Sequence, residues 1–314
     1  MLKELLETKH CFKLVCGAGN EDVEEIKRLV YIYAIAGCRL FDLSANEDVI
    51  NAAREALELA KVYDAYLCIS VGIKDDPHIK KAVIDYDRCV NCGACEVTCP
   101  QGAIKDAKIK KEKCVGCGKC WKVCSRAAIS YVSEEKNLDE VLPPIVEKGI
   151  DCIELHATGL DEEEIFSKWQ YICDNYEGLL SICVSRDKLS DDALIKRITR
   201  MIENRLEYST IIQADGFPLS GGDDNYKSTL QTVATAEIVQ NAKLPVYLVL
   251  SGGTNSKTTE LAKMCEISYH GVAVGSYARK IVREYVESPD FWTNPEIVNN
   301  ALTFAKTLVD SVIL

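Results

Sequence analysis

Short β-rich runs alternate with longer amphipathic runs eight times along this chain, and no other feature restricts its fold so strongly. The runs that predict strands cover residues 12–16, 39–43, 66–71, 152–156, 179–184, 210–214, 246–250 and 271–274. Eight such units in about 250 residues predict an α/β fold, a (β/α)8 barrel of the TIM type. A doubly wound open sheet is the alternative, but it would carry its glycine-rich turn after the first strand, whereas here the later turns are glycine-rich.

The helices that alternate with these strands are predicted at residues 22–36, 47–61, 139–148, 162–175, 191–206, 228–241, 256–265 and 277–287. The third and fourth strands are too far apart for one unit, which leaves room for an insertion of about 50–60 residues. The insertion follows a strand and precedes its helix, so it lies on the carboxyl-terminal face, where barrels build active sites. We expect a barrel formed by residues 1–77 and 132–314, with residues 78–131 as the insert.

Eight of the 16 cysteines fall within this insertion, in two copies of the spacing C-x2-C-x2-C-x3-C. Three thiolates in a tight loop can hold three irons of one [4Fe–4S] cluster, while the fourth ligates the other cluster. The spacing predicts one cluster on Cys89, Cys92, Cys95 and Cys124 and a second on Cys114, Cys117, Cys120 and Cys99. A pair of zinc ribbons is the alternative, but this spacing suits tetrahedral pairing poorly. The segment resembles bacterial two-cluster ferredoxins, although Ser125 replaces the proline that usually follows the last cysteine.

Charge and composition narrow the classes of partner. The chain has a net charge of −11, yet residues 78–131 hold 11 Lys and Arg against 5 Asp and Glu. This surplus fits an acidic redox partner, although a solvated hairpin would explain it equally. The overall acidity argues against nucleic acid, and no apolar run is long enough to span a bilayer. The charged first ten residues do not read as a signal peptide, and abundant thiols suit a reducing cytoplasm. We therefore expect a cytoplasmic protein.

Glycine-rich turns follow the last two predicted strands, where many barrels bind a phosphate through backbone N–H groups. These turns resemble those of FMN-binding barrels such as dihydroorotate dehydrogenase, so we expect a phosphate-bearing ligand, with FMN as one candidate; glycine could also be there for steric reasons alone. Polar residues at other strand ends would line the same mouth, and residues 214–226 would form a lid. The candidate ligand-binding residues are Gly252, Gly253, Thr254, Gly275, Ser276, Arg186, His156 and Asp215.

Several blocks of the whole chain resemble the light-dependent period protein A family of cyanobacteria. They are residues 12–19, 76–78, 213–224, 244–258 and 270–279. The resemblance implies an iron–sulfur protein that responds to cellular redox state, which in cyanobacteria feeds the circadian clock. It implies neither a reaction nor, for this chain, the clock partners.

Two functions follow from these features. The first is electron transfer or redox sensing, with the barrel as scaffold and docking surface. The alternative is an oxidoreductase whose clusters relay electrons to a flavin or another ligand in the barrel, although the sequence contains no legible general base, so catalytic residues stay unassigned. A radical-generating enzyme is weaker still, because its diagnostic C-x3-C-x2-C spacing is absent.

Overall fold

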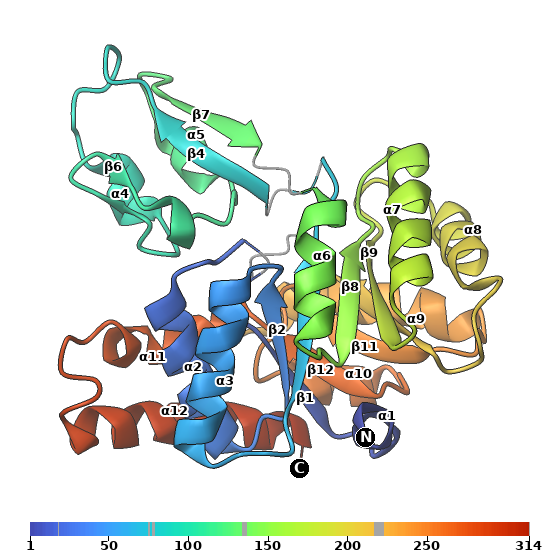
Figure 1. Ribbon diagram of the computed structural model, residues 1–314. Coiled ribbons are helices and arrows are strands. Elements are labelled where there is room, and N and C mark those ends of the chain that lie inside the picture. Colours follow the sequence, from blue (N-terminus) through green and yellow to red (C-terminus); the bar gives the residue numbers. More distant parts are fainter. Residues whose placement is uncertain (18, 75, 77–78, 134–136, 217–222, 314) are drawn as a thin grey trace.

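Eight parallel strands close into a barrel in the computed structural model of the chain (Figure 1), which describes all residues except 18, 75, 77–78, 134–136, 217–222 and 314. The barrel strands are β1 (Cys11–Val15), β2 (Leu40–Ser44), β3 (Tyr66–Val71), β8 (Cys152–His156), β9 (Leu179–Ser185), β10 (Thr210–Asp215), β11 (Tyr247–Ser251) and β12 (Gly271–Val274). They pair in the closed order β1-β12-β11-β10-β9-β8-β3-β2. The predicted (β/α)8 barrel is confirmed.

Helices cover the outside of this barrel. They are α2 (Val23–Ala36), α3 (Glu47–Ala60), α6 (Leu138–Glu147), α7 (Glu162–Asn175), α8 (Asp191–Ile202), α9 (Tyr226–Asn241), α10 (Thr258–Met264) and α11 (Ser276–Val286). Six of them begin at a residue whose side chain accepts a hydrogen bond from the first turn: Asp22, Asn46, Asn137, Asp161, Ser190 and Asn225. Each such cap stabilises its helix by about 1 kcal/mol.

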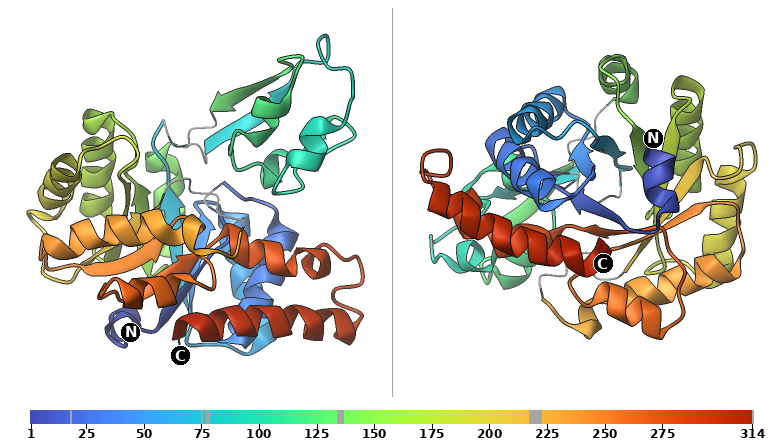
Figure 2. Two further views of the ribbon diagram at one scale, coloured as in Figure 1. Left: turned by 180° about the vertical axis from the view of Figure 1, so that it is seen from behind. Right: turned by 90° about the horizontal axis from the view of Figure 1, so that it is seen from below.

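Two helices of the barrel lie outside the eight predicted units. The short helix α1 (Leu2–Glu7) lies at the amino-terminal end of the barrel, and the view from below in Figure 2 shows it there. Its Leu2 and Leu6 join a cluster of inward strand residues that includes Cys11 and Tyr247. The long helix α12 (Pro295–Ile313) is the last in the chain and packs beside α2 and α11. Both helices cover apolar surface that the eight units alone would leave exposed.

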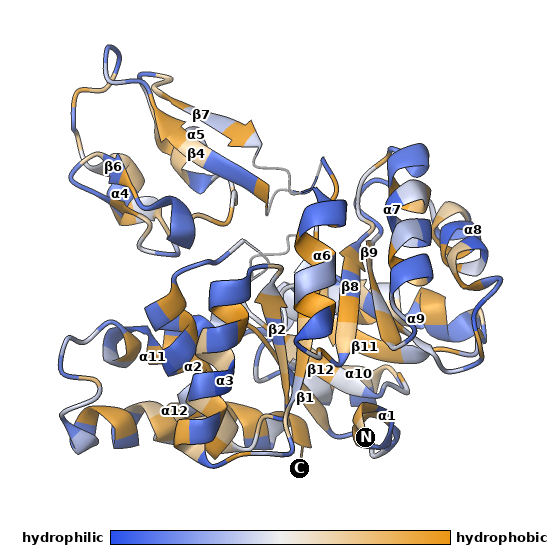
Figure 3. Cartoon of the chain, viewed as in Figure 1, coloured by the Kyte–Doolittle hydropathy of each residue, from blue (hydrophilic) through white to orange (hydrophobic). Residues whose placement is uncertain are grey.

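The main core lies between the strands and the helices. Apolar side chains fill this layer, among them Phe12, Ile153 and Val272, each at most 2% exposed. Figure 3 shows the same division, because orange predominates along the barrel strands while the helices carry both blue and orange stretches. None of the helices formed by the described residues combines the length and hydropathy that crossing a membrane requires.

The insert follows β3 and stands over the carboxyl-terminal end of the barrel (Figure 1). Its two longer strands, β4 (Lys80–Ile84) and β7 (Ile129–Ser133), pair antiparallel. Between them lie α4 (Ala94–Thr98), the strand pair β5 (Ile104–Lys105) and β6 (Lys108–Ile109), a 3-10 turn (Lys111–Lys113) and α5 (Lys119–Val123). A small separate core holds this unit together, with Ala82, Ile104 and Ile129 at its centre.

Candidate functional site

The insert contains two similar cysteine loops, each of which leads into a short helix. The residue before α4 is Gly93 (φ 75°) and the residue before α5 is Gly118 (φ 78°). Residues with a Cβ rarely adopt this left-handed conformation, so glycine allows each loop to turn tightly at this point. The two loops therefore have similar shapes. The first three cysteines of one loop line one pocket, and the first three cysteines of the other loop line a second pocket.

The first pocket combines cysteines from both ends of the insert. Its lining includes Cys89, Cys92, Cys95 and Cys124. Ile84 and Ile129 supply apolar walls, and the backbone N–H of Ala128 donates to Cys124 Sγ at 3.3 Å. The four cysteines that the sequence predicts as ligands of the first cluster therefore line one pocket.

The second pocket gathers the other four cysteines of the insert. Its lining includes Cys99, Cys114, Cys117 and Cys120. The backbone N–H groups of Ala82 and Ala103 donate to Cys114 Sγ at 3.4 Å and to Cys99 Sγ at 3.3 Å. Tyr131 Oη lies 3.3 Å from Cys120 Sγ. Donors aimed at sulfur stabilise thiolates and tune cluster potentials, so both cysteine sets fit a [4Fe–4S] cluster.

Burial affects the ionisation of these thiols. It raises the pKa of Cys95, Cys117 and Cys120 above the usual thiol value. A thiol that coordinates a metal is deprotonated, so cluster assembly must supply the free energy that ionises them.

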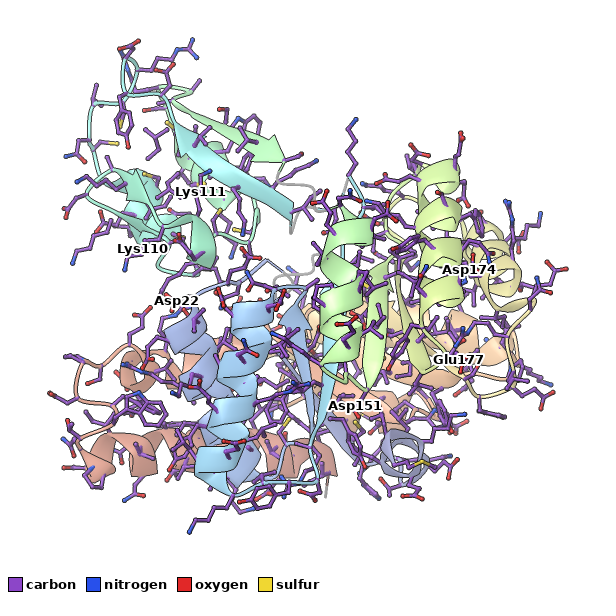
Figure 4. All side chains as sticks on the ribbon, viewed as in Figure 1. Asp22, Lys110, Lys111, Asp151, Asp174 and Glu177 are labelled. Carbon is purple, nitrogen blue, oxygen red and sulfur yellow. The ribbon has the colours of Figure 1, made fainter. Side chains whose placement is uncertain are left out.

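A charged contact joins the insert to the barrel. Lys113 Nζ lies 3.0 Å from Glu25 Oε2, 3.2 Å from Glu287 Oε1 and 3.8 Å from Asp22 Oδ2. Figure 4 shows Asp22 at the end of α2 that faces the insert. Nearby, the buried Lys81 Nζ donates to Gly19 O at 2.6 Å and to Cys114 O at 2.9 Å. The second cysteine set therefore lies beside the loop that follows β1.

The middle of the barrel interior is polar. Six buried side chains make this layer: Lys13, Asp42, Ser70, Glu154, Ser181 and Gln213. Lys13 Nζ lies at its centre, 2.7 Å from Glu154 Oε2, 2.8 Å from Gln213 Oε1 and 3.3 Å from Asp42 Oδ2. Buried charges persist only when they are paired in this way.

The ionisation of this layer follows from its contacts. Burial alone would lower the pKa of Lys13, but Asp42 and the other acidic groups, Glu154 included, hold that pKa well above its usual value. Burial would raise the pKa of Glu154, but Lys13 holds it well below its usual value. For Asp42 burial outweighs Lys13, and the pKa of that carboxyl is raised. Lys13 and Glu154 are thus the charged pair, and a protonated Lys13 is not a nucleophile.

A second polar layer lies at the carboxyl-terminal end of the barrel strands. His156 Nδ1 is 2.6 Å from Asp76 Oδ2, and His156 Nε2 is 3.4 Å from Glu154 Oε1. Cys183 Sγ donates to Asp215 Oδ2 at 2.7 Å. The other oxygen of Asp215, Oδ1, is buried and has no hydrogen-bond partner among the described residues.

The pKa values in this layer are displaced from their usual values. Burial alone would lower the pKa of His156, but Asp76 raises it well above the usual histidine value. Burial raises the pKa of Asp215 to about 6 and that of the Cys183 thiol well above its usual value. Displaced values of this kind, in the mouth of a barrel, are typical of a functional site.

The structure does not bring the eight candidate ligand-binding residues together at one place. His156 and Asp215 belong to the polar layer just described. Arg186 lies beyond β9 and pairs with Asp191 at the start of α8, at 3.3 Å. The Thr254 hydroxyl is buried and donates to Ala273 O at 2.5 Å.

The glycines of the last two turns lie close to other backbone. β11 and β12 are paired, so the turns that contain Gly252–Gly253 and Gly275–Ser276 are neighbours. A Cβ on Gly252 would lie 2.7 Å from Gly216 N, so a steric role for this glycine is established beside any role in binding. The middle of the expected lid, residues 217–222, falls outside the described residues.

Sequence reasoning missed Lys13, Glu154, Ser70 and Ser181. Each is a polar residue inside an apolar strand run, and Lys13 and Glu154 stand two residues from inward neighbours at Cys11 and Cys152. The alternation of the strands would have placed them inside the barrel. The alternation of side chains along the strands is present in the sequence. It places these residues inside the barrel only if the strands are known to form a closed barrel.

Comparisons with known proteins agree with this architecture. The model of the light dependent period A C-terminal domain matches residues 144–311, and the 4Fe-4S binding domain matches residues 82–105 and 107–130. The light dependent period A protein of Synechococcus elongatus is 29% identical over 327 aligned positions, which cover 98% of this chain and 92% of that protein.

Solved structures show the fold alone. The YdjI aldolase from Escherichia coli K12 has a TM-score of 0.54 at 7% identity, and the match covers 99% of this chain and 96% of that one. A putative fructose-1,6-biphosphate aldolase from Coccidioides immitis has a TM-score of 0.50 at 11% identity, covering 99% and 94%. These identities carry no statement about activity. The family model spans more than half of the chain, and the cluster-binding motifs fall within the insert. The chain therefore belongs to the light dependent period A family, and it is an iron–sulfur redox protein.

Proposed function

We propose that the insert carries two [4Fe–4S] clusters and passes electrons between an external redox partner and the barrel. One cluster would use Cys89, Cys92, Cys95 and Cys124, and the other Cys114, Cys117, Cys120 and Cys99. The observation that carries this proposal is the convergence of each set on its own pocket, with the fourth cysteine of each run in the pocket of the other. When bound, such clusters take up and release single electrons.

The two cysteine sets differ in their surroundings, and this difference supports a direction of transfer. The second set lies beside the barrel, because Lys81 bridges Cys114 O and Gly19 O. In the first set Cys92 is exposed, and neighbouring Val90 is 61% exposed. We therefore assign the first cluster to exchange with the partner and the second to exchange with the barrel.

The charge of the insert supports an acidic partner. The insert is basic while the rest of the chain is acidic, and complementary charge raises the rate of encounter. We place this exchange in the cytoplasm, because none of the 16 cysteines forms a disulfide and free thiols persist in a reducing compartment. The division into a barrel of residues 1–77 and 132–314 and an insert of residues 78–131 is part of the same proposal.

Metal and sulfide analysis of anaerobically purified protein tests the ligand sets. We expect about eight irons and eight sulfides per chain, from two cubic clusters. Cys92→Ser should retain about four irons through loss of the first cluster, and Cys117→Ser about four through loss of the second. Cys265→Ser, which alters an exposed cysteine outside the insert, is the matched control and should retain about eight. About four irons in the unaltered protein, or no loss in either insert variant, would contradict the proposal.

A second candidate is an oxidoreductase that holds a phosphate-bearing ligand, FMN among the candidates, at the barrel mouth. The specific support is the first turn of α11. Its N-cap is Gly275, which offers no side chain to the free N–H groups, in contrast to the six capped helices. Free N–H groups at a helix N-terminus favour an anion. FMN, when bound, would accept electrons from the clusters.

Release of the bound ligand tests this second candidate. Acid treatment of the purified protein should release stoichiometric flavin, and Ser276→Glu should abolish its retention by placing a negative charge at the expected phosphate position. Thr303→Glu on the exposed face of α12 is the control and should retain flavin. In both variants the iron content should stay unchanged. Eight irons without flavin would exclude FMN and leave the barrel as scaffold or sensor.

A further inference from the structure

Three different metal-binding side chains meet at the carboxyl-terminal end of β8 and β9. They are Glu154, His156 and Cys183, and one donor atom from each lies within 4.8 Å of the others. Glu154 and His156 are two residues apart on β8, so both point into the barrel. His156 lies opposite Cys183 in the pairing of β8 with β9. The grouping therefore follows directly from the strand register.

The histidine is oriented as metal ligands are. Its Nδ1 is held by Asp76 Oδ2 at 2.6 Å, while its Nε2 faces Glu154 Oε1 at 3.4 Å. A carboxylate on the far nitrogen of a ligating histidine fixes the ring and raises its basicity. Tetrahedral zinc bonds of about 2.0–2.2 Å place two N or O ligands about 3.4 Å apart, so this spacing suits a shared ion.

A fourth donor, Asp215, contacts the thiol of this group, although it is not one of the three residues whose donor atoms lie within 4.8 Å of one another. Asp215 Oδ2 accepts from Cys183 Sγ at 2.7 Å, and Asp215 Oδ1 is buried without a hydrogen-bond partner among the described residues. Asp215 is only 4% exposed, so an unsatisfied carboxylate oxygen there is costly. A metal bound to both side chains would replace the thiol proton, lengthen this contact by about 1 Å and satisfy the carboxylate.

We propose that Glu154, His156, Cys183 and Asp215 bind one Zn²⁺ inside the barrel, separate from the iron–sulfur clusters. The mixed donor set of one nitrogen, one sulfur and two carboxylate oxygens in four positions favours zinc over harder ions such as Mg²⁺. Lys13 pairs with the other oxygen of Glu154, Oε2. Oε1 accepts from Gln213 Nε2 at 3.0 Å, which fixes the carboxylate and leaves a second lone pair of Oε1 for the ion. Asp76 is a positioning residue that acts through His156.

Elemental analysis combined with zinc X-ray absorption tests the site in the intact protein. We expect about one zinc per chain after purification, in addition to the cluster iron, with one sulfur and three nitrogen or oxygen neighbours. Zinc bound wrongly at the cluster cysteines would instead show four sulfur neighbours. That spectrum, or less than about 0.1 zinc per chain after incubation with Zn²⁺, would overturn the proposal.

Single substitutions distinguish loss of a zinc ligand from loss of the fold. His156→Gln and Cys183→Ala should lose the zinc while the iron content stays unchanged, and Asp76→Asn should weaken zinc affinity by about 10- to 100-fold. Cys152→Ala changes a buried cysteine at the other end of β8 and should retain zinc. Zinc retention in His156→Gln, with the spectrum unchanged, would contradict the assignment. The zinc and iron readouts are independent, so failure here leaves the electron-transfer proposal intact.

Discussion

Lys13 balances the buried carboxylates of the barrel interior. Its side chain is 4% exposed and lies within 3.3 Å of acceptors on Glu154, Gln213 and Asp42. Charges that leave water for a barrel interior lose several kcal/mol of hydration each, and only close pairing offsets this loss. Lys13 therefore makes the polar layer possible, and the layer in turn holds Glu154 in position beneath His156.

Removing this lysine should destabilise the barrel strongly. We expect Lys13→Met to cost about 3–5 kcal/mol, because it leaves a buried carboxylate without its partner. The thermal unfolding midpoint of the anaerobic protein, followed by far-UV circular dichroism, would measure the loss. Adding Glu154→Gln should restore part of the stability by removing the orphaned charge.

The matched control for this prediction is a surface pair. Lys27 Nζ lies 2.8 Å from Glu55 Oε2 on the outside of the barrel, and Glu55 is 61% exposed. Lys27→Met should cost less than about 1 kcal/mol. Equal losses from the two lysine variants would show that burial does not determine the strength of the interior pair.

At the scale of elements, His270 joins the amino-terminal ends of β11 and β12. Its backbone N–H donates to Leu248 O at 2.7 Å, and its Nδ1 accepts from Leu248 N at 2.9 Å. Its ring packs edge-on against Tyr247 at 5.1 Å. Nδ1 can accept this hydrogen bond only while it is unprotonated. Burial, assisted by the charge of Lys9, accordingly lowers the pKa of His270 below its usual value.

This pKa shift predicts a loss of stability in mild acid. Since the unfolded chain takes up the proton more readily than the folded one, stability falls as the pH drops below about 6.5. His270→Asn keeps an acceptor but does not titrate, so the wild type should lose more stability than this variant between pH 7.5 and 5.5.

Unfolding midpoints at the two pH values measure the effect. His10→Asn alters an exposed histidine outside the strands and should keep the wild-type pH dependence. Identical pH dependence in the wild type and in His270→Asn would contradict the assigned role.

The elements also show which parts of the fold local patterns can predict. Each of the eight strands was predicted to within a residue or two, because a buried strand needs a continuous apolar run. The helices α1 and α12 were not predicted, because they follow no strand and complete the coverage of surfaces that exist only after the barrel has closed. The eight-cysteine motif could be recognised in the sequence because all eight cysteines lie within 36 residues. Of the proposed zinc ligands Glu154, His156, Cys183 and Asp215, the sequence analysis singled out only His156 and Asp215. The four residues lie on three strands, so their grouping depends on the strand register.

At the scale of the whole molecule, polar contacts join the insert to the barrel. Lys113 reaches three carboxylates on the barrel, and Glu21 N donates to Glu112 O at 2.7 Å. The second cysteine set follows immediately, since Cys114 is the next residue after Lys113. The contact that fixes the insert therefore also fixes the position of the second cysteine set, which is the set nearest the barrel.

Loss of the Lys113 contact should loosen the insert without unfolding either part. In Lys113→Met we expect the Glu21 amide to exchange its hydrogen roughly fivefold to tenfold faster, which corresponds to about 1 kcal/mol of lost local stability. Exchange in the barrel strands and the iron content should stay unchanged, because the two cores are separate. Lys148→Met breaks a comparable pair with Glu47 between α6 and α3 and is the control. Faster exchange throughout the barrel in Lys113→Met would mean that the insert supports the barrel as a whole, whereas a change confined to the junction would identify Lys113 as the residue that positions the second cluster.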